Sequence, residues 1–279
     1  MTSVCAGVAN IVLDAALVIL LPQEYKLAGA AIATATSQMT AGIIPLVYFG
    51  KKNGSILRLG KTKFESKALL KACINGSSEF MSNIAMSVVG MLYNIQLLKY
   101  AGENGVAAYG VMMYVSMVFS GSFIGYSIGT APIFGYHDGA QNYAELKSLL
   151  KKSLIMIGVF AVVMVGAAEL LATPLAKIFV GYDAELLELT VSGFHIYALS
   201  FLFMGYAIFG SGFFTALNDG VTSAIISFLR TLVFQIAAVM LLPLILDIDG
   251  IWYSVVVAEL MAVVISFIFM IIKRKKYHY

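Results

Sequence analysis

The chain of 279 residues is 60% hydrophobic and only 12% charged, with a net charge of +3 and a mean hydropathy of +0.90. A soluble domain carries roughly 25% charged residues, so this composition excludes an ordinary soluble protein. Apolar stretches of about 20 residues, enough to cross a hydrocarbon core ~30 Å thick, recur along the whole chain. We therefore expect an all-α, polytopic membrane protein with about eight transmembrane helices.

The first expected span begins at the second residue, with no basic segment and no small-residue cleavage site before it. This is not the pattern of a secretory signal peptide. We expect this span to be an interior helix of a longer protein that has been truncated. In chain order, the expected spans are Thr2–Leu21, Leu27–Phe49, Ala72–Leu98, Ala107–Phe134, Leu154–Leu171, Ser192–Leu217, Thr222–Leu246 and Gly250–Ile272.

Basic residues are sorted strongly among the predicted loops. Fifteen fall on one side of the expected topology, including the loop Gly50–Lys71, Arg230 near the start of the seventh span and the tail Lys273–Lys276. The other side receives three, which are Lys26, Lys99 and Lys177. Because cytoplasmic loops are enriched in Lys and Arg, we predict a multi-pass plasma-membrane protein with both termini in the cytoplasm. The basic tail fits a membrane anchor, with binding of anionic lipid as the alternative.

The first two and the last two expected helices form an internal repeat. At an offset of 221 residues, Pro22 aligns with Pro243, Gly29 with Gly250 and Gln38 with Glu259. The shared spacing of Pro and Gly is the specific part of this match, because both residues dictate backbone geometry. Direct repeats are common in transporters.

The repeat predicts how the chain is divided. Residues 1–49 would be the last two helices of an N-terminal bundle, residues 50–71 a basic cytoplasmic linker, and residues 72–279 a complete C-terminal bundle of six helices. The intact parent would then have twelve helices in a 6+6 pseudo-repeat, of which this chain lacks the first four.

Several local sequences resemble the multidrug and toxic compound extrusion (MATE) family of antiporters. The resemblance covers essentially the whole chain and rests on the order and spacing of its motifs. They are Asn10-Ile-Val-Leu-Asp14, Gly29-Ala-Ala-Ile-Ala-Thr34, Asn75-Gly-Ser-Ser-Glu79, Gly105-Val-Ala-Ala-Tyr-Gly110, Gly125-Tyr-Ser-Ile-Gly-Thr-Ala-Pro132 and Tyr136-His-Asp-Gly-Ala140.

The resemblance implies two six-helix bundles facing each other across a V-shaped cavity. It also implies alternating access that exports cationic, amphipathic small molecules in exchange for Na⁺ or H⁺. No cofactor beyond the coupling ion and no nucleic-acid partner is expected, and the intact protein is expected to be monomeric in the lipid bilayer. One alternative is a lipid-linked oligosaccharide flippase of the same superfamily, and another is an inactive truncated fragment. An intramembrane enzyme is not expected, because the sequence lacks a recognisable hydrolase or metalloprotease motif.

Asp14 lies in the middle of the first span, where an ionisable group is costly and is by default a candidate functional residue. Asn10 precedes it by four residues and so shares its helical face. Thr34 lies at a similar expected depth in the second span. Loss of water favours the neutral form of a carboxylate, so Asp14 could load and release a proton, or hold Na⁺ with the neighbouring oxygens. The resemblance implies the same role for Asn10, Asp14 and Thr34. A helix-to-helix hydrogen bond is the structural alternative.

Carboxylates in the later spans are candidates for contact with substrate or ion. Glu79 follows a Gly-Ser-Ser stretch that favours local unwinding, and interfacial anchoring is its alternative role. Glu259, opposite Gln38 in the repeat, lies at the centre of the last span. Glu169 is expected at the outer interface, and Trp252 in the interfacial aromatic belt. The aromatic stretch Phe201–Phe214 fits either a cavity for aromatic cations or helix packing.

Overall fold

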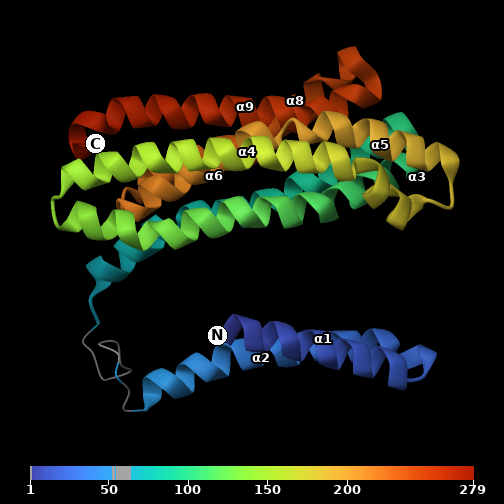
Figure 1. Ribbon diagram of the computed structural model, residues 1–279, viewed down its shortest axis with the longest axis horizontal. Helices are drawn as coiled ribbons and strands as arrows, with labels where there is room; N and C mark the ends of the chain where they lie inside the picture. Colours follow the sequence, from blue (N-terminus) through green and yellow to red (C-terminus); the bar gives the residue numbers. More distant parts are fainter. Residues whose placement is uncertain (1, 52–53, 55–63) are drawn as a thin grey trace. The chain divides into compact units, whose positions relative to one another are not determined.

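A computed structural model describes residues 2–51, 54 and 64–279, and these form helices and connecting turns without a strand. The chain divides into two compact units, Met1–Glu65 and Ser66–Tyr279, both drawn in Figure 1. The division falls within the predicted linker. Half of that linker lies outside the described residues, and its last part is already helical, because α3 begins at Ser66.

The first unit is a helical hairpin of α1 (Thr2–Leu20), the 3₁₀ turn η1 (Gln23–Tyr25) and α2 (Lys26–Gly50). The buried residues on its helices are small, namely Ala6, Gly29, Ala33 and Ser37. Small residues let two helices in a membrane approach closely. At the turn, a Cβ on Gly29 would lie 2.8 Å from Leu21 Cδ1 and 3.1 Å from Leu17 Cβ, so glycine lets Leu17 and Leu21 pack closely here.

The second unit is a bundle of longer helices. Its elements are α3 (Ser66–Gly139), α4 (Tyr143–Val180), α5 (Ala184–Ala198), α6 (Phe201–Ala216), α7 (Gly220–Phe228), the π-helical turn η2 (Leu229–Phe234), α8 (Gln235–Leu241) and α9 (Pro243–Tyr277).

The long element α3 consists of two spans that fold back at Gly102. This glycine has φ of 62° and ψ of −153°, which is not helical. Tyr93 and Tyr109 stack with ring centroids 5.1 Å apart, whereas residues 16 positions apart in one straight helix would be ~24 Å apart. The two halves of α3 are therefore the third and fourth predicted spans.

The number of membrane crossings agrees with the eight predicted. Six helices of the described chain are long and apolar enough to span, or seven when α5 and α6, bent by 50°, count as one span. Separating α3 at Gly102 adds one more. The seventh span runs through α7, η2 and α8, and the eighth lies in α9, whose backbone turns sharply at Asp247 with φ of 47°.

The internal repeat predicted from the sequence has a structural counterpart. A Cβ on Gly250 would lie 2.5 Å from the Leu242 carbonyl, just as one on Gly29 would meet Leu21. Leu21 and Leu242 are separated by the same offset of 221 residues as the two glycines. Both hairpins thus place a glycine against the residue that precedes the proline.

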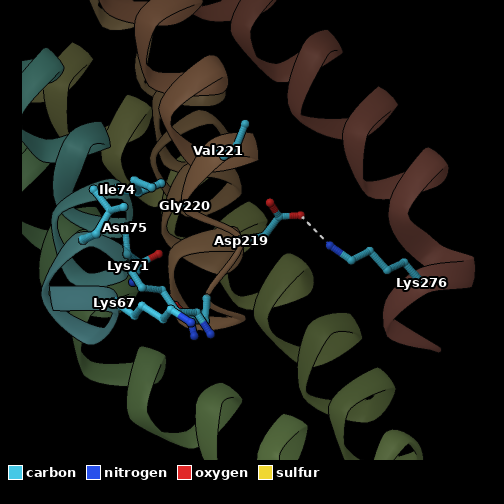
Figure 2. Close-up of a pocket in the computed structure, with 10 residues that line it drawn as sticks. Lys67, Lys71, Ile74, Asn75, Asp219, Gly220, Val221 and Lys276 are labelled. Atoms are coloured by element: carbon cyan, nitrogen blue, oxygen red, sulfur yellow. Dashed lines mark hydrogen bonds and ion pairs between the residues drawn. The ribbon is translucent and has the colours of Figure 1, made fainter. Parts of the chain in front are cut away.

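One end of the second unit gathers the start of α3, the α6–α7 turn and the end of α9. Asn75 Nδ2 donates to Thr215 O at 3.3 Å, and Tyr277 Oη donates to Asp219 Oδ2 at 2.8 Å. Figure 2 shows Lys67 of α3 and Lys276 of α9 on either side of this turn. Within this unit, the basic loops that the sequence predicts on one side do share one end.

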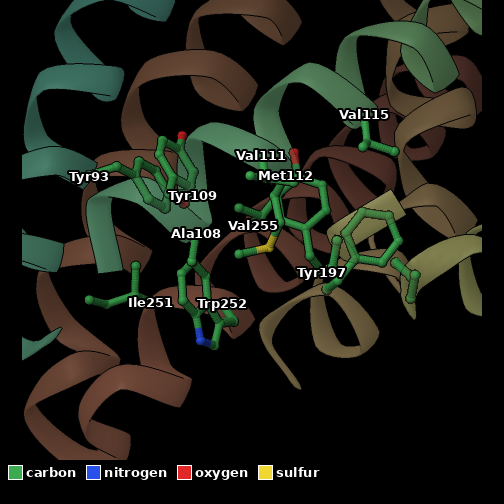
Figure 3. Packing of buried hydrophobic residues seen from close by; sticks show 14 of the residues in the cluster. Tyr93, Ala108, Tyr109, Val111, Met112, Val115, Tyr197, Ile251, Trp252 and Val255 are labelled. Atoms are coloured by element: carbon green, nitrogen blue, oxygen red, sulfur yellow. The ribbon is translucent and has the colours of Figure 1, made fainter. Parts of the chain in front are cut away.

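Large aromatic side chains fill the interior of the second unit, as Figure 3 shows around Tyr93, Tyr109 and Trp252. Trp252 is only 1% exposed, and a Cβ on Gly193 would lie 2.8 Å from its ring. The prediction that Trp252 belongs to an interfacial belt is therefore wrong, because a glycine in α5 leaves room for its indole in the core. In the stretch Phe201–Phe214, the buried residues include Phe201, Phe209, Phe213 and Phe214, which favours the packing alternative.

Candidate functional site

Asp14 is a polar group inside the first hairpin whose Oδ1 is buried and has no hydrogen-bond partner among the described residues. It lies twelve residues beyond the first residue of α1, Thr2. A rise of ~1.5 Å per residue places it ~18 Å along the helix. Asn10, one turn earlier, is half-buried on the same face. A buried oxygen without a donor favours a hydrogen-bond donor or a cation at this position, because a buried polar group is costly unless it is paired.

Thr34 is exposed, and its hydroxyl donates to Ala30 O within α2 at 3.1 Å. The part of the chain that the structure describes contains no hydrogen bond from Thr34 to Asn10 or Asp14. Asn10 and Asp14 are thus brought onto one helical face, and a joint site with Thr34 stays a prediction. Gln38 is exposed, whereas its neighbour Ser37 occupies the buried face of α2.

Glu259 lies in the interior of the second unit and is only 3% exposed. Arg230 binds it with three hydrogen bonds, from Nε to Oε1 at 3.2 Å, from Nε to Oε2 at 2.9 Å and from Nη2 to Oε1 at 2.9 Å. This bidentate geometry is the strong form of an ion pair. The carboxylate of Glu259 is present, as predicted, at the centre of the last span, but its charge is neutralised.

Arg230 was expected near the start of the seventh span, and the structure places it inside the bundle. It lies ten residues after Gly220, where α7 begins, which is ~15 Å along the helix axis. It belongs to the π-helical turn η2. Such turns are rare and are frequent at functional sites. Sequence reasoning missed the pair because Arg230 and Glu259 are 29 residues apart and on different helices.

A second group of polar contacts lies around Tyr93. The Tyr93 hydroxyl donates to Gln235 Oε1 at 2.8 Å and lies 2.7 Å from Ser254 Oγ. Gln235 directly follows the π-helical turn that holds Arg230, and Ser254 precedes Glu259 by five residues on α9. The interior of the second unit thus contains a charged pair and a neutral polar network between α3, α8 and α9.

Glu79 is exposed on the first half of α3. The only non-helical backbone within α3 is at Gly102, so the local unwinding expected before Glu79 does not occur. The hydroxyl of Ser77 donates to Ile74 O at 2.6 Å, which keeps that polar group within the helix. Both possible roles of Glu79, contact with substrate or ion and interfacial anchoring, therefore stay predictions.

Glu169 on α4 pairs with His195 on α5, through Oε2 and Nδ1. Their side chains are 39% and 45% exposed, and the interfacial position of Glu169 stays a prediction. The sequence held no signal for this pair, because the two residues are 26 positions apart. A cavity of about 510 Å³ lies beside His195 and is lined also by Thr173 and Glu188.

The eight crossings and the internal repeat define a polytopic helical membrane protein with repeated helical hairpins. The chain belongs to the MatE family, because the family's sequence profile matches residues 80–241. The prediction of a MATE relative is thereby confirmed.

Curated relatives extend the match over most of the chain. It is 25% identical over 251 residues to the Multidrug export protein MepA of Staphylococcus haemolyticus, covering 90% of this chain and 54% of the relative. It is 24% identical, with the same coverage, to the Multidrug export protein MepA of Staphylococcus aureus strain NCTC 8325. The chain thus spans about half the length of the curated relatives it matches.

Solved structures show the same fold. A crystal structure of MATE in complex with MaL6 superposes with a TM-score of 0.90 at 20% identity, covering 98% of this chain and 62% of that one. An outward-facing multidrug resistance MATE family transporter of the MOP superfamily gives a TM-score of 0.87 at 20% identity, covering 98% and 61%. A MOP superfamily transporter from Pyrococcus furiosus gives 0.88 at 20% identity, covering 98% and 62%.

Proposed function

We propose that this chain is the C-terminal portion of a plasma-membrane antiporter that exports cationic, amphipathic compounds in exchange for Na⁺ or H⁺. Membership of the MatE family and the similarity to proteins named for multidrug export support the export function. Both termini would lie in the cytoplasm, where the excess of basic residues in the loops would hold them. The intact protein would work as a monomer in the bilayer.

The buried, unpaired Oδ1 of Asp14 is the observation that carries the coupling part of the proposal. A proton on this oxygen could be donated to a neighbouring group, and Na⁺ prefers such oxygen ligands. Asn10 would supply the second oxygen from one turn earlier on α1. Occupation by either ion would compete with a drug cation, directly or by rearranging the helices, and this competition is antiport.

In the second unit, the buried carboxylate of Glu259 does not offer a free negative charge, because Arg230 neutralises it. A cationic substrate would contact the exposed Glu79 of this unit, or the exposed Gln38 of the first unit, more readily. The flippase alternative gains no support from Arg230, since its guanidinium is committed to Glu259 rather than free for a pyrophosphate.

Ethidium efflux from bacterial cells that lack their own drug exporters tests both parts of the proposal. The chain is expressed with any coding sequence that continues in frame upstream of Met1. We expect active efflux, and we expect Asp14→Asn to reduce it to the level of cells with empty vector while membrane expression is unchanged. Asp183→Asn is the matched control, because Asp183 caps α5 and Asn is an equally good N-cap.

Different results would contradict the export function and the coupling role of Asp14. Wild-type efflux equal to that of empty vector would contradict the export function. Wild-type efflux that persists unchanged in Asp14→Asn would contradict the coupling role of Asp14 and leave the export function standing.

A further inference from the structure

A cavity of about 280 Å³ opens at the basic end of the second unit, between the start of α3, the α6–α7 turn and the end of α9. Its volume is several times the ~30 Å³ that one water molecule occupies in the liquid, so it can admit a larger group. The elements around it are the ends of membrane-spanning helices, which places the cavity at the level of lipid headgroups. Ten of the described residues line it: Lys67, Leu70, Lys71, Ile74, Asn75, Asn218, Asp219, Gly220, Val221 and Lys276.

Three lysines from two helices surround this cavity, as Figure 2 shows. Lys67 and Lys71 are one turn apart on α3, both exposed, and neither forms an ion pair within the described residues. Lys276 Nζ lies 3.5 Å from Asp219 Oδ2, which is a weak contact for a side chain that is 58% exposed. Lys67 and Lys71 therefore present positive charge that no carboxylate in the described part of the chain neutralises.

Asp219, the acidic residue among the described residues that line the cavity, is already engaged by the protein. Its Oδ1 accepts the backbone N–H of Thr222 at 3.3 Å, which caps α7. Its Oδ2 accepts from Tyr277 at 2.8 Å and lies 3.3 Å from Lys273 Nζ. Burial opposes ionisation, but hydrogen bonds from Tyr277, Thr222 and Lys273 prevail and lower the pKa of the Asp219 carboxyl to about 2. Asp219 thus holds α9 to the turn and leaves Lys67 and Lys71 for another anion.

Asn75 provides an independent observation that points to a ligand. Its Nδ2 donates to Thr215 O, which fixes the orientation of the amide. Its Oδ1 is buried and has no donor among the described residues, and Asn75 is one of the residues that line the cavity. A group that satisfied the whole site would combine an anion for the lysines with a hydroxyl or similar donor for Asn75.

We propose that this cavity binds the headgroup of an anionic phospholipid, with the phosphate held by Lys67, Lys71 and Lys276 and a headgroup hydroxyl donating to Asn75 Oδ1. Phosphatidylglycerol has both features. Basic pockets between transmembrane helices on the cytoplasmic side bind anionic headgroups in this manner, and this end carries the basic loops predicted to face the cytoplasm. A bound lipid there would link α3, α7 and α9 at one end of the bundle.

Native mass spectrometry of the purified chain in detergent tests the site. Palmitoyl-oleoyl phosphatidylglycerol is titrated in parallel with phosphatidylcholine, with phosphatidylethanol, which has the same charge but no headgroup hydroxyl, and with inorganic phosphate as competitor. We expect one retained phosphatidylglycerol per chain, a Kd about fivefold higher for phosphatidylethanol, and no retained phosphatidylcholine. Lys67→Gln with Lys71→Gln should raise the Kd for phosphatidylglycerol about 30-fold.

The matched control is Lys147→Gln with Lys151→Gln on α4. Both of these lysines are exposed, one turn apart and outside the cavity, and the change in net charge is the same. Unchanged binding in this control supports the proposal. An equal loss in both double variants would overturn it in favour of diffuse attraction to a basic surface. Equal retention of phosphatidylcholine, or displacement by inorganic phosphate at concentrations equal to the lipid, would also overturn it.

Discussion

The Arg230–Glu259 pair allows a quantitative test of how the second unit is held together. Glu259 is 4% and Arg230 18% exposed at the side chain, and three hydrogen bonds join them. Replacing Arg230 by Met leaves the carboxylate of Glu259 buried without its partner. Breaking a buried pair in this way costs about 3–5 kcal/mol, because the remaining charge is uncompensated.

The double variant is the informative one. Replacing both residues by Met removes the two charges together and keeps a similar volume of apolar side chain. Such replacements are often neutral or stabilising, so we expect the Arg230→Met, Glu259→Met protein to unfold within about 1 kcal/mol of the wild type. Each single variant should be clearly less stable.

Thermal unfolding in detergent measures this difference. A loss of about 3 kcal/mol corresponds to a Tm lowered by about 6–12 °C for a chain of this size. The double variant should recover most of that decrease. A double variant as unstable as the sum of the two single variants would refute the reasoning, because independent residues have additive effects. Glu169→Gln serves as a control, since the exposed Glu169–His195 pair should contribute less than about 1 kcal/mol.

Two further predictions concern Asp219 at the basic end of the second unit and Gly193 in its core. Asp219 has a pKa of about 2 when folded, below the ~3.9 of an unfolded chain, so its charge stabilises the fold above that value and loses this effect as pH falls toward 2. Asp219→Asn should therefore lower the free energy of unfolding by about 2 kcal/mol at pH 7. The difference in stability from the wild type should shrink between about pH 5 and pH 2. A difference that does not change with pH would contradict this prediction. Gly193→Ala places a Cβ 2.8 Å from Trp252 and should cost about 1–3 kcal/mol, whereas Gly166→Ala on α4, with open space around it, should be neutral or stabilising. Equal effects of the two glycine substitutions on Tm would show that the contact with Trp252 is unimportant.

The number of helices and the turn positions could be predicted from the sequence because each rests on local information. A hydrophobic stretch of about 20 residues is itself a membrane span, and the pairing of Pro22 with Pro243 and Gly29 with Gly250 is a pattern of spacing. The contact of each glycine with the leucine before the proline follows from that pattern.

The position and pairing of Arg230 could not be predicted in the same way. A charge near the start of a long apolar stretch is compatible with the interface or with the interior, and hydropathy does not distinguish them. The buried position of Arg230 depends on Glu259, which faces it from another helix, and on the π-helical turn that contains Arg230. Trp252 shows the same limit, since its burial depends on the space left by Gly193 in α5.

The repeat also shows how the two units have diverged in charge. Gln38 and Glu259 are equivalent in sequence, yet Gln38 is neutral and exposed, whereas Glu259 is buried and neutralised by Arg230. Among the described residues, Asp14 of the first unit has no arginine or lysine partner, and its Oδ1 is buried without a hydrogen bond. A carboxylate that already has a guanidinium partner gains little from a second cation, whereas one with a buried, unpaired oxygen gains more. If a coupling ion binds to one of these two carboxylates, Asp14 is therefore the better candidate, and Glu259 is better suited to fixing α9 against the π-helical turn.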